Sequence, residues 1–397
     1  MQQQLFRKVI WLTVGLITVI LVIIKISSSK STATDLQKVL KNANILPQDV
    51  INYNSRKVTD ELASKLDEIQ KKYLSKQDDR ISKLEAERAD LLEQVRFLRN
   101  PPAGSSLREK LAYLFPYNEN GKFPAYIWQT WKYGLNDDRF GEKFKEGETQ
   151  WASKNPGFVH ELFNDDTSGV FIHHLYINVP EVIKAYELLP NIILKMDFFR
   201  YLVLYAKGGV YADVDTMPLQ PVPNWIPENV SPKSIGMIIG IQNDANNPDW
   251  KKDYVHRLQF SNWCIQAKPG HPILRELIAK ITEDTLQRAE SNSLELADIS
   301  EEGGLSDKNL SIMQWTGTGI FTDAIFTYFN DYIQSSIYTK VTWKEFSKLR
   351  KPKLVSDVLV LPIISFSAGA GSGKSTELND PLAFVQHYFE RLHNDNH

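Results

Sequence analysis

Two aspartates separated by a single residue, Asp213 and Asp215, are the side chains best suited to chemistry in this sequence. They lie in GGVYADVDT (residues 208–216), where the apolar residues predict a strand over residues 210–214. Side chains two positions apart on a strand point the same way, and neighbouring carboxylates repel unless a cation lies between them. Their oxygen atoms favour a hard divalent ion, Mn²⁺ or Mg²⁺ rather than Zn²⁺. We therefore predict that both aspartates bind such an ion, although a lone Asp-x-Asp is more typical of a solvated turn.

A helix predicted over residues 192–206 carries two more candidates, Asp197 and Arg200, which share a face because they are three positions apart. The glycines at 208–209 let the chain turn tightly into the strand, so all four side chains can meet at its C-terminal end. A divalent ion there leaves positions open for phosphate oxygens and assists the departure of a nucleoside diphosphate. Asp197 can accept hydrogen bonds from sugar or ribose hydroxyls, and Arg200 can pair with an electron-rich oxygen near the reacting carbon. A structural ion-pair network is the alternative.

The elements that must position these residues alternate between strands and helices from residue 107 onward, which predicts one α/β domain over residues 107–397. The predicted strands cover residues 125–131, 158–163, 210–214, 235–241, 259–267 and 355–366, the last interrupted by Pro362. The predicted helices cover residues 179–189, 192–206, 272–287 and 319–333.

Residues 9–26 (VIWLTVGLITVILVIIKI) contain one charge, Lys25, and predict a membrane anchor. As a helix they span about 27 Å, enough for a thin bilayer. A cleaved signal peptide, the alternative, would have a shorter apolar region and a small-residue cleavage site, which the following SSSKSTAT does not match. We expect residues 1–8 to form a short cytoplasmic tail and the rest of the chain to lie in the lumen. The short span favours an early secretory membrane.

Residues 27–106 are expected to form a lumenal stem. Between residues 62 and 98, charges alternate in sign, glycine and proline are absent, and apolar residues recur at three- and four-residue steps. They predict a coiled coil over about residues 53–99 that joins a second copy or a homologous partner. The steps from Tyr73 to Ile81 break the strict heptad, so a solvated single-helix spacer is the alternative.

Composition excludes other classes of protein. The chain has 46 Lys and Arg against 48 Asp and Glu, a net charge of −2, which argues against a nucleic-acid partner. One cysteine, Cys264, excludes a disulfide scaffold and a cysteine-based zinc cluster. AGAGSGKS (residues 368–375) nearly fits a phosphate-binding loop after a strand, but a poor helix start follows, so we expect a flexible loop. His173 and His174 are expected at the surface, because adjacent helix positions do not face one metal.

The run from Lys195 to Thr216 resembles the DXD-containing sugar-binding signature of GT-A glycosyltransferases. Residues 107–390 resemble the fungal α-1,6-mannosyltransferases that act on N-glycan outer chains in the Golgi. The resemblance also rests on FPY (115–117), FP (123–124), IWQTW (127–131), SKNPG (153–157), IQAKPGHP (265–272) and WTGTG (315–319). The anchor, the TDLQ start of the stem (34–37) and the coiled stem are similar to those of members found in a cis-Golgi mannan polymerase complex.

The resemblance implies a GT-A-like fold, a Rossmann-like mixed sheet with flanking helices, and transfer of mannose from GDP-mannose to a glycan acceptor in α-1,6 linkage with retained configuration. It implies that Asp215 binds the metal and that Asp213 contacts the metal or the donor's ribose and sugar. Asp197 and Arg200 would hold the mannose, so that Arg200 joins the two aspartates as a catalytic residue.

The same resemblance assigns Trp131 to stacking on the nucleotide base, with a core tryptophan as the alternative. Gly317 and Gly319 would let the backbone approach the diphosphate. His387 matches a family histidine that approaches the metal or diphosphate. The pattern departs here, because no Ser-Trp follows His387 and the chain ends ten residues later. A surface-helix histidine is therefore the alternative.

Two other functions are compatible with the sequence. The long stem is also expected of a non-catalytic or weakly active subunit of a Golgi mannosyltransferase complex. A mannosyltransferase with a sphingolipid acceptor would share the DXD signature, but relatives of that kind usually have additional membrane spans. The intact aspartates favour an active enzyme.

Overall fold

The computed structural model describes residues 71–88, 90–91, 100–246, 248–296, 307–333, 339–369 and 378–388. The chain divides into two compact units, Met1–Val95 and Arg96–His397. The predicted anchor at residues 9–26 lies outside the described residues. Within the described ranges, no helix is both long enough and apolar enough to cross a membrane.

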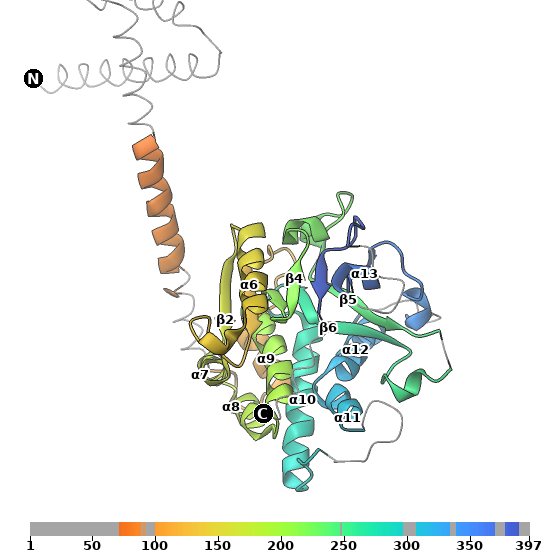
Figure 1. Cartoon of the computed structure of the whole chain (residues 1–397). Coiled ribbons are helices and arrows are strands. Elements are labelled where there is room, and N and C mark those ends of the chain that lie inside the picture. Colours follow the sequence, from red (N-terminus) through yellow and green to blue (C-terminus); the bar gives the residue numbers. More distant parts are fainter. Residues whose placement is uncertain are drawn as a thin grey trace, which may run out of the picture. The chain divides into compact units, whose positions relative to one another are not determined.

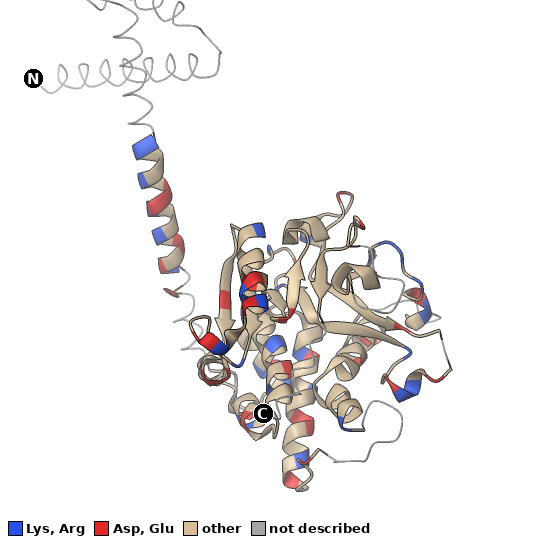
Figure 2. Ribbon diagram, in the orientation of Figure 1, with Lys and Arg blue, Asp and Glu red and all other residues tan. Residues whose placement is uncertain are grey.

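In the first unit, residues 71–88 and 90–91 are helical (orange in Figure 1), and every side chain described there is exposed. This confirms the predicted helix over that range. Basic and acidic residues follow one another along it (Figure 2). Leu74, Ile81, Leu84 and Leu91 are 53%, 50%, 56% and 60% exposed, so the helix presents a set of apolar side chains to its surroundings. The coiled coil stays a prediction.

The second unit is built on a seven-stranded mixed sheet with the strand order β2-β1-β3-β6-β5-β8-β7 (Figure 1). Strand β1 is parallel to β2 and β3, whereas β6 is antiparallel to both β3 and β5. A separate antiparallel pair joins β4 to β9. The strands are β1 (Tyr126–Thr130), β2 (Val159–Phe163), β3 (Gly209–Ala212), β4 (Thr216–Pro218), β5 (Met237–Asp244), β6 (Leu258–Ala267), β7 (Lys353–Val355), β8 (Val358–Leu361) and β9 (Val385–His387).

Helices cover the sheet and bury its apolar side chains in a large core. They are α5 (Leu107–Leu114), α6 (Glu142–Lys154), α7 (Asp165–Leu175), α8 (Pro180–Leu188), α9 (Ile192–Lys207), α10 (Pro272–Glu290), α11 (Asp307–Trp315), α12 (Thr318–Thr327) and α13 (Ile363–Phe366). A π-helical turn, Tyr328–Tyr332, continues α12. Mixed strands with helices between them confirm the predicted α/β class.

Helix α9 is the element that connects the core to the site. Every residue from Asp197 to Ala206 is buried, as expected for a helix that is apolar on almost all sides. The helix ends at Lys207 and is followed by Gly208, with φ +69°, and Gly209, with φ +98°. A Cβ on Gly208 would lie 2.7 Å from a carbon of Pro269, and one on Gly209 would lie 2.7 Å from the Tyr126 carbonyl oxygen. The predicted tight turn from helix to strand therefore requires this glycine pair.

Most predicted elements are confirmed to within a few residues, but one is wrong. The strand expected over residues 355–366 is the end of a β7–β8 hairpin followed by α13, because Pro362 begins a helix rather than interrupting a strand. The strand expected over residues 210–214 ends at Ala212. Cys264 is buried on β6, as predicted for a small apolar side chain.

Candidate functional site

Asp213 and Asp215 lie in a tight turn between β3 and β4, not on a strand as predicted. The backbone N–H of Thr216 donates to the Asp213 carbonyl at 3.1 Å, and the Thr216 hydroxyl donates to the same oxygen at 2.5 Å. The Asp213 N–H donates to the Trp263 carbonyl on β6 at 2.8 Å. These hydrogen bonds fix the turn at Asp213 and at Thr216. The turn, and not the alternation of side chains along a strand, therefore brings the two carboxylates together.

His387 joins these aspartates from a distant part of the chain. It lies on β9, which pairs with β4 so that His387 is opposite Thr216, and its Nε2 is 3.2 Å from Asp215 Oδ1. The ring stacks on Trp263, with centroids 4.8 Å apart and an interplanar angle of 15°. His387 is 8% exposed, so the alternative of a surface-helix histidine is wrong.

The three side chains fit a divalent cation. One ligand atom from each of Asp213, Asp215 and His387 lies within 4.8 Å of the other two. Two carboxylate oxygens with one imidazole nitrogen suit Mn²⁺ well, whereas Mg²⁺ prefers oxygen ligands alone. Burial raises the pKa of Asp213, Arg200 opposes the rise, and the charge of Asp215 adds to it. A bound cation would relieve this repulsion.

Arg200 connects helix α9 to the aspartate turn. Its Nη2 lies 3.0 Å from Asp197 Oδ1 and 3.4 Å from Asp213 Oδ1, and its Nη1 donates to the Asn262 carbonyl at 3.0 Å. The guanidinium also lies over the ring of Tyr211, 4.9 Å from the centroid. Arg200 thus holds both carboxylates in place, a role that helix spacing alone did not predict.

Asp197 is buried and accepts hydrogen bonds from three elements. Besides Arg200, Asn262 Nδ2 on β6 donates to Oδ1 at 3.1 Å, and the Thr316 hydroxyl donates to Oδ2 at 3.3 Å. Burial raises its pKa to about 6, against the opposing effect of Arg200. Sequence reasoning missed both neutral partners. Thr316 lies within the WTGTG stretch, but nothing in the sequence distinguishes Asn262.

A cavity of about 420 Å³ opens beside these groups. Its walls come from the end of β1, the start of α7, the first half of α9 and the aspartate turn. The lining residues are Thr130, Trp131, Lys132, Asp165, Asn191, Ile192, Ile193, Met196, Arg200, Asp213, Val214 and Asp215. The volume is within the range of small-molecule sites.

Trp131 belongs to the core and also lines the cavity. It is 8% exposed and packs against Phe144, with ring centroids 4.5 Å apart, so it belongs to a small core cluster. It also lines the cavity, and its buried Nε1 has no hydrogen-bond partner within the part of the chain that the structure describes. Stacking on a nucleotide base stays a prediction.

Gly317 and Gly319 flank the start of α12, and only Gly317 adjoins the site. A Cβ on Gly317 would lie 2.9 Å from Met313 Cα and 3.4 Å from Asp197 Oδ2. A Cβ on Gly319 would lie 2.7 Å from the Met313 carbonyl oxygen, which is a contact between α11 and α12. Helix packing thus accounts for both glycines, and their approach to a diphosphate stays a prediction.

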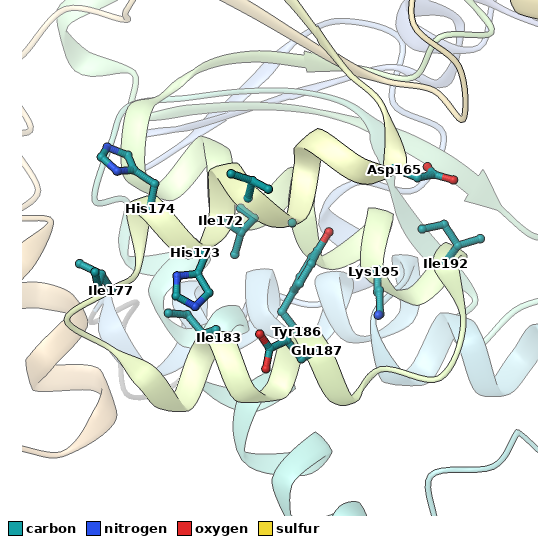
Figure 3. Close-up of a pocket in the computed structure, with 12 residues that line it drawn as sticks. Asp165, Ile172, His173, His174, Ile177, Ile183, Tyr186, Glu187, Ile192 and Lys195 are labelled. Carbon is teal, nitrogen blue, oxygen red and sulfur yellow. The ribbon is translucent and has the colours of Figure 1, made fainter.

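A second pocket lies between α7, α8 and the start of α9 (Figure 3). His173 and His174 line it and are exposed, which confirms the predicted surface location. Residues 370–377 of the glycine-rich stretch lie outside the described residues. The helix α13 separates this stretch from β8, so it does not directly follow a strand as expected.

Comparisons with known proteins agree with this site. Residues 141–232 match the family described as glycosyltransferase sugar-binding region containing DXD motif. HOC1 of Saccharomyces cerevisiae, named as a glycosyltransferase, is 45% identical over 339 residues, covering 85% of this chain and 83% of that protein. The initiation-specific alpha-1,6-mannosyltransferase of Candida albicans is 43% identical, covering 72% of this chain and 76% of that protein. That of Saccharomyces cerevisiae is 32% identical, covering 72% and 81%.

Proposed function

The chain belongs to the family of fungal α-1,6-mannosyltransferases, and from this premise we propose that it transfers mannose from GDP-mannose to a mannan or N-glycan acceptor in α-1,6 linkage. It is a glycosyltransferase, and its DXD family implies a divalent metal and a nucleotide-sugar donor. The observation that carries the proposal is the convergence of Asp213, Asp215 and His387 beside a cavity that Arg200 also lines.

Asp213, Asp215 and His387 would hold the metal, with Mn²⁺ favoured over Mg²⁺ by the imidazole ligand. The ion supplies positive charge that binds the diphosphate and stabilises it as it leaves. Arg200 keeps Asp197 and Asp213 at fixed positions and adds a second positive charge beside the diphosphate. Asp197 is held by Asn262 and Thr316 beside Arg200, and we propose that it accepts a hydrogen bond from a hydroxyl of the donor's mannose.

The stereochemical proposal is retention of the α configuration. Retention by double displacement needs a carboxylate nucleophile that can reach the anomeric carbon. Asp197 is already engaged by Arg200, Asn262 and Thr316, which argues against that role. We therefore favour attack by the acceptor on the same face from which GDP departs.

Residues 9–26 and the helical stem support a Golgi membrane location, in the cis-Golgi, as a single-pass type II protein with the head in the lumen. The described helix also bears on assembly. From residue 74 to residue 91 the steps alternate between three and four residues, through the positions Leu74, Gln77, Ile81, Leu84, Arg88 and Leu91. Exposed leucine and isoleucine at such positions favour a coiled coil over a spacer.

The proposal is tested by incubating the detergent-solubilised full chain with Mn²⁺ and GDP-mannose, UDP-glucose or UDP-galactose, and measuring nucleotide release. We expect release of GDP from GDP-mannose alone, and a loss on the order of 1,000-fold in Asp215→Asn. An oligomannoside and an inositol-containing sphingolipid as acceptors separate the two acceptor classes. Release that is equal with and without the oligomannoside, but stimulated by the lipid, would reassign the acceptor.

The non-catalytic alternative makes the opposite prediction. A structural subunit would show no donor turnover, while deletion of residues 53–99 would abolish its association with other Golgi mannosyltransferases. We expect that deletion to weaken association and to leave GDP binding unchanged, because the cavity is lined entirely by residues of the second unit.

A further inference from the structure

The cavity beside the metal ligands extends along the first half of helix α9. Arg200, Asp213 and Asp215 line one end, and Ile192 lines the same cavity from the start of the helix. Eight residues separate Ile192 from Arg200, which corresponds to about 12 Å along the helix axis. A nucleotide whose diphosphate lies at the aspartates would therefore extend its base toward the start of α9.

Asp165 is the acidic residue of the cavity lining that lies outside the metal and arginine cluster. It also lines the neighbouring pocket, as does Ile192. Figure 3 draws Asp165 and Ile192 at the same end of that pocket, apart from His173 and His174. The two residues therefore lie where the cavity adjoins the next pocket, and Ile192 is remote from Arg200 along α9.

The local fold leaves the Asp165 carboxylate available to a ligand. Asn164 caps helix α7, since its side chain accepts a hydrogen bond from the Thr167 N–H at 2.8 Å, so Asp165 is not needed as the cap. The side chain is partly buried, and burial together with the charge of Asp166 raises its pKa. Lys132, whose charge opposes this rise, lines the same cavity. A ligand edge with N–H donors would stabilise the partly buried carboxylate.

Guanine has such an edge. Its N1–H and its 2-amino group point the same way and can both donate to one carboxylate, and its neighbouring O6 accepts from a cation such as the Lys132 ammonium. Uracil presents a single N–H between two carbonyl oxygens, so a carboxylate placed there would meet at least one acceptor. Adenine has an unprotonated N1 in place of the guanine N–H.

We propose that Asp165 selects the donor's base by accepting hydrogen bonds from N1–H and the 2-amino group of guanine. This inference rests on the proposed function, because it takes the diphosphate to lie at the aspartate turn. It assigns nucleotide selectivity to the start of α7, separate from the metal ligands that hold the diphosphate of any donor.

The test is a titration of the detergent-solubilised full chain with GDP and with xanthosine diphosphate, in the presence of Mn²⁺. Xanthine has a carbonyl in place of the 2-amino group of guanine. The natural chain should prefer GDP, and Asp165→Asn should weaken GDP binding about 10- to 100-fold. The same variant should bind xanthosine diphosphate more tightly than the natural chain does, because the asparagine amide donates to the new carbonyl. This gain also shows that the variant is folded.

Asp166→Asn is the matched control, since Asp166 is the adjacent, exposed aspartate. It should leave the preference between the two nucleotides unchanged. An Asp165→Asn chain with the same preference as the natural chain overturns the assignment of Asp165 while leaving the donor proposal intact. Failure of the natural chain to bind GDP overturns the donor proposal itself, and this inference with it.

Discussion

Asp357, in the turn between β7 and β8, is surrounded by donors, whereas Asp213 and Asp215 face a cavity. The hydroxyls of Tyr117 and Tyr328 donate to Asp357 at 2.5 and 2.8 Å, and His271 Nε2 lies 3.3 Å away. Burial would raise the pKa of Asp357, but these hydrogen bonds hold it well below its usual range.

The two clusters lie at opposite ends of the strands of one sheet. Strands β3 and β5 run in the same direction, because each is antiparallel to β6. The Asp357 carbonyl accepts from the N–H of Gly236, just before β5, while Asp213 follows the end of β3. Hydrogen bonds within the protein stabilise the charged form of Asp357, whereas burial and the charge of Asp215 raise the pKa of Asp213. The contrast separates a carboxylate that stabilises the fold from carboxylates arranged to bind a cation.

Removing each charge in turn should affect the two clusters differently. Asp357→Asn should lower the free energy of unfolding by about 1–3 kcal/mol, because Tyr117, Tyr328 and His271 then lose a charged acceptor. Asp215→Asn should not lower it in metal-free protein, since it relieves repulsion with Asp213. Urea denaturation in a chelator measures both. Equal destabilisation by the two substitutions would show that the aspartate turn is a structural network after all.

The raised pKa of Asp197, which lies beside Arg200, predicts that the stability of the fold depends on pH. Its pKa is about 6 in the folded chain and about 3.9 when unfolded, so the folded state holds its proton more tightly. The resulting stabilisation is present below about pH 4 and is lost as the pH rises through 6, by at most about 3 kcal/mol. Urea denaturation of metal-free natural chain and Asp197→Asn, between pH 4 and pH 7, isolates this contribution. A difference between them that does not vary with pH would contradict the raised pKa.

Mn²⁺ should stabilise the second cluster and not the first. At a concentration 100 times its dissociation constant, a ligand that binds only the folded state adds about 2.7 kcal/mol to the free energy of unfolding. Asp357→Asn should retain this increment, and Asp215→Asn should lose it. Thermal unfolding with and without Mn²⁺ provides the measurement. An increment that survives in Asp215→Asn would place the ion elsewhere.

The sequence predicted the part of the site that depends on neighbouring residues. Asp197 and Arg200 share a helix face, and the glycine pair provides the turn, so both could be inferred from spacing. The sequence predicts a strand at Asp213 and Asp215, where the structure has a turn, because apolar residues precede them. The hydrogen bonds from Thr216 that close this turn have no sequence signature.

Long-range pairing explains what residue spacing alone did not predict. The family resemblance implied that His387 approaches the metal, but its contact with Asp215, 172 residues away, depends on the pairing of β9 with β4, and neither strand was predicted. Asn262 reaches Asp197 from β6, and Asp165 enters the cavity from the start of α7, through the packing of elements that share no sequence pattern. Such residues become apparent only when the sheet order is known.

We propose that Asp213, Asp215 and His387 form one metal site for a nucleoside diphosphate. Isothermal titration of Mn²⁺ into the full chain, with and without GDP, tests it most directly. We predict one ion per chain, bound more tightly when GDP is present, and loss of binding in both Asp215→Asn and His387→Ala. Mn²⁺ binding that is unchanged in these two variants, or indifferent to GDP, would contradict the account.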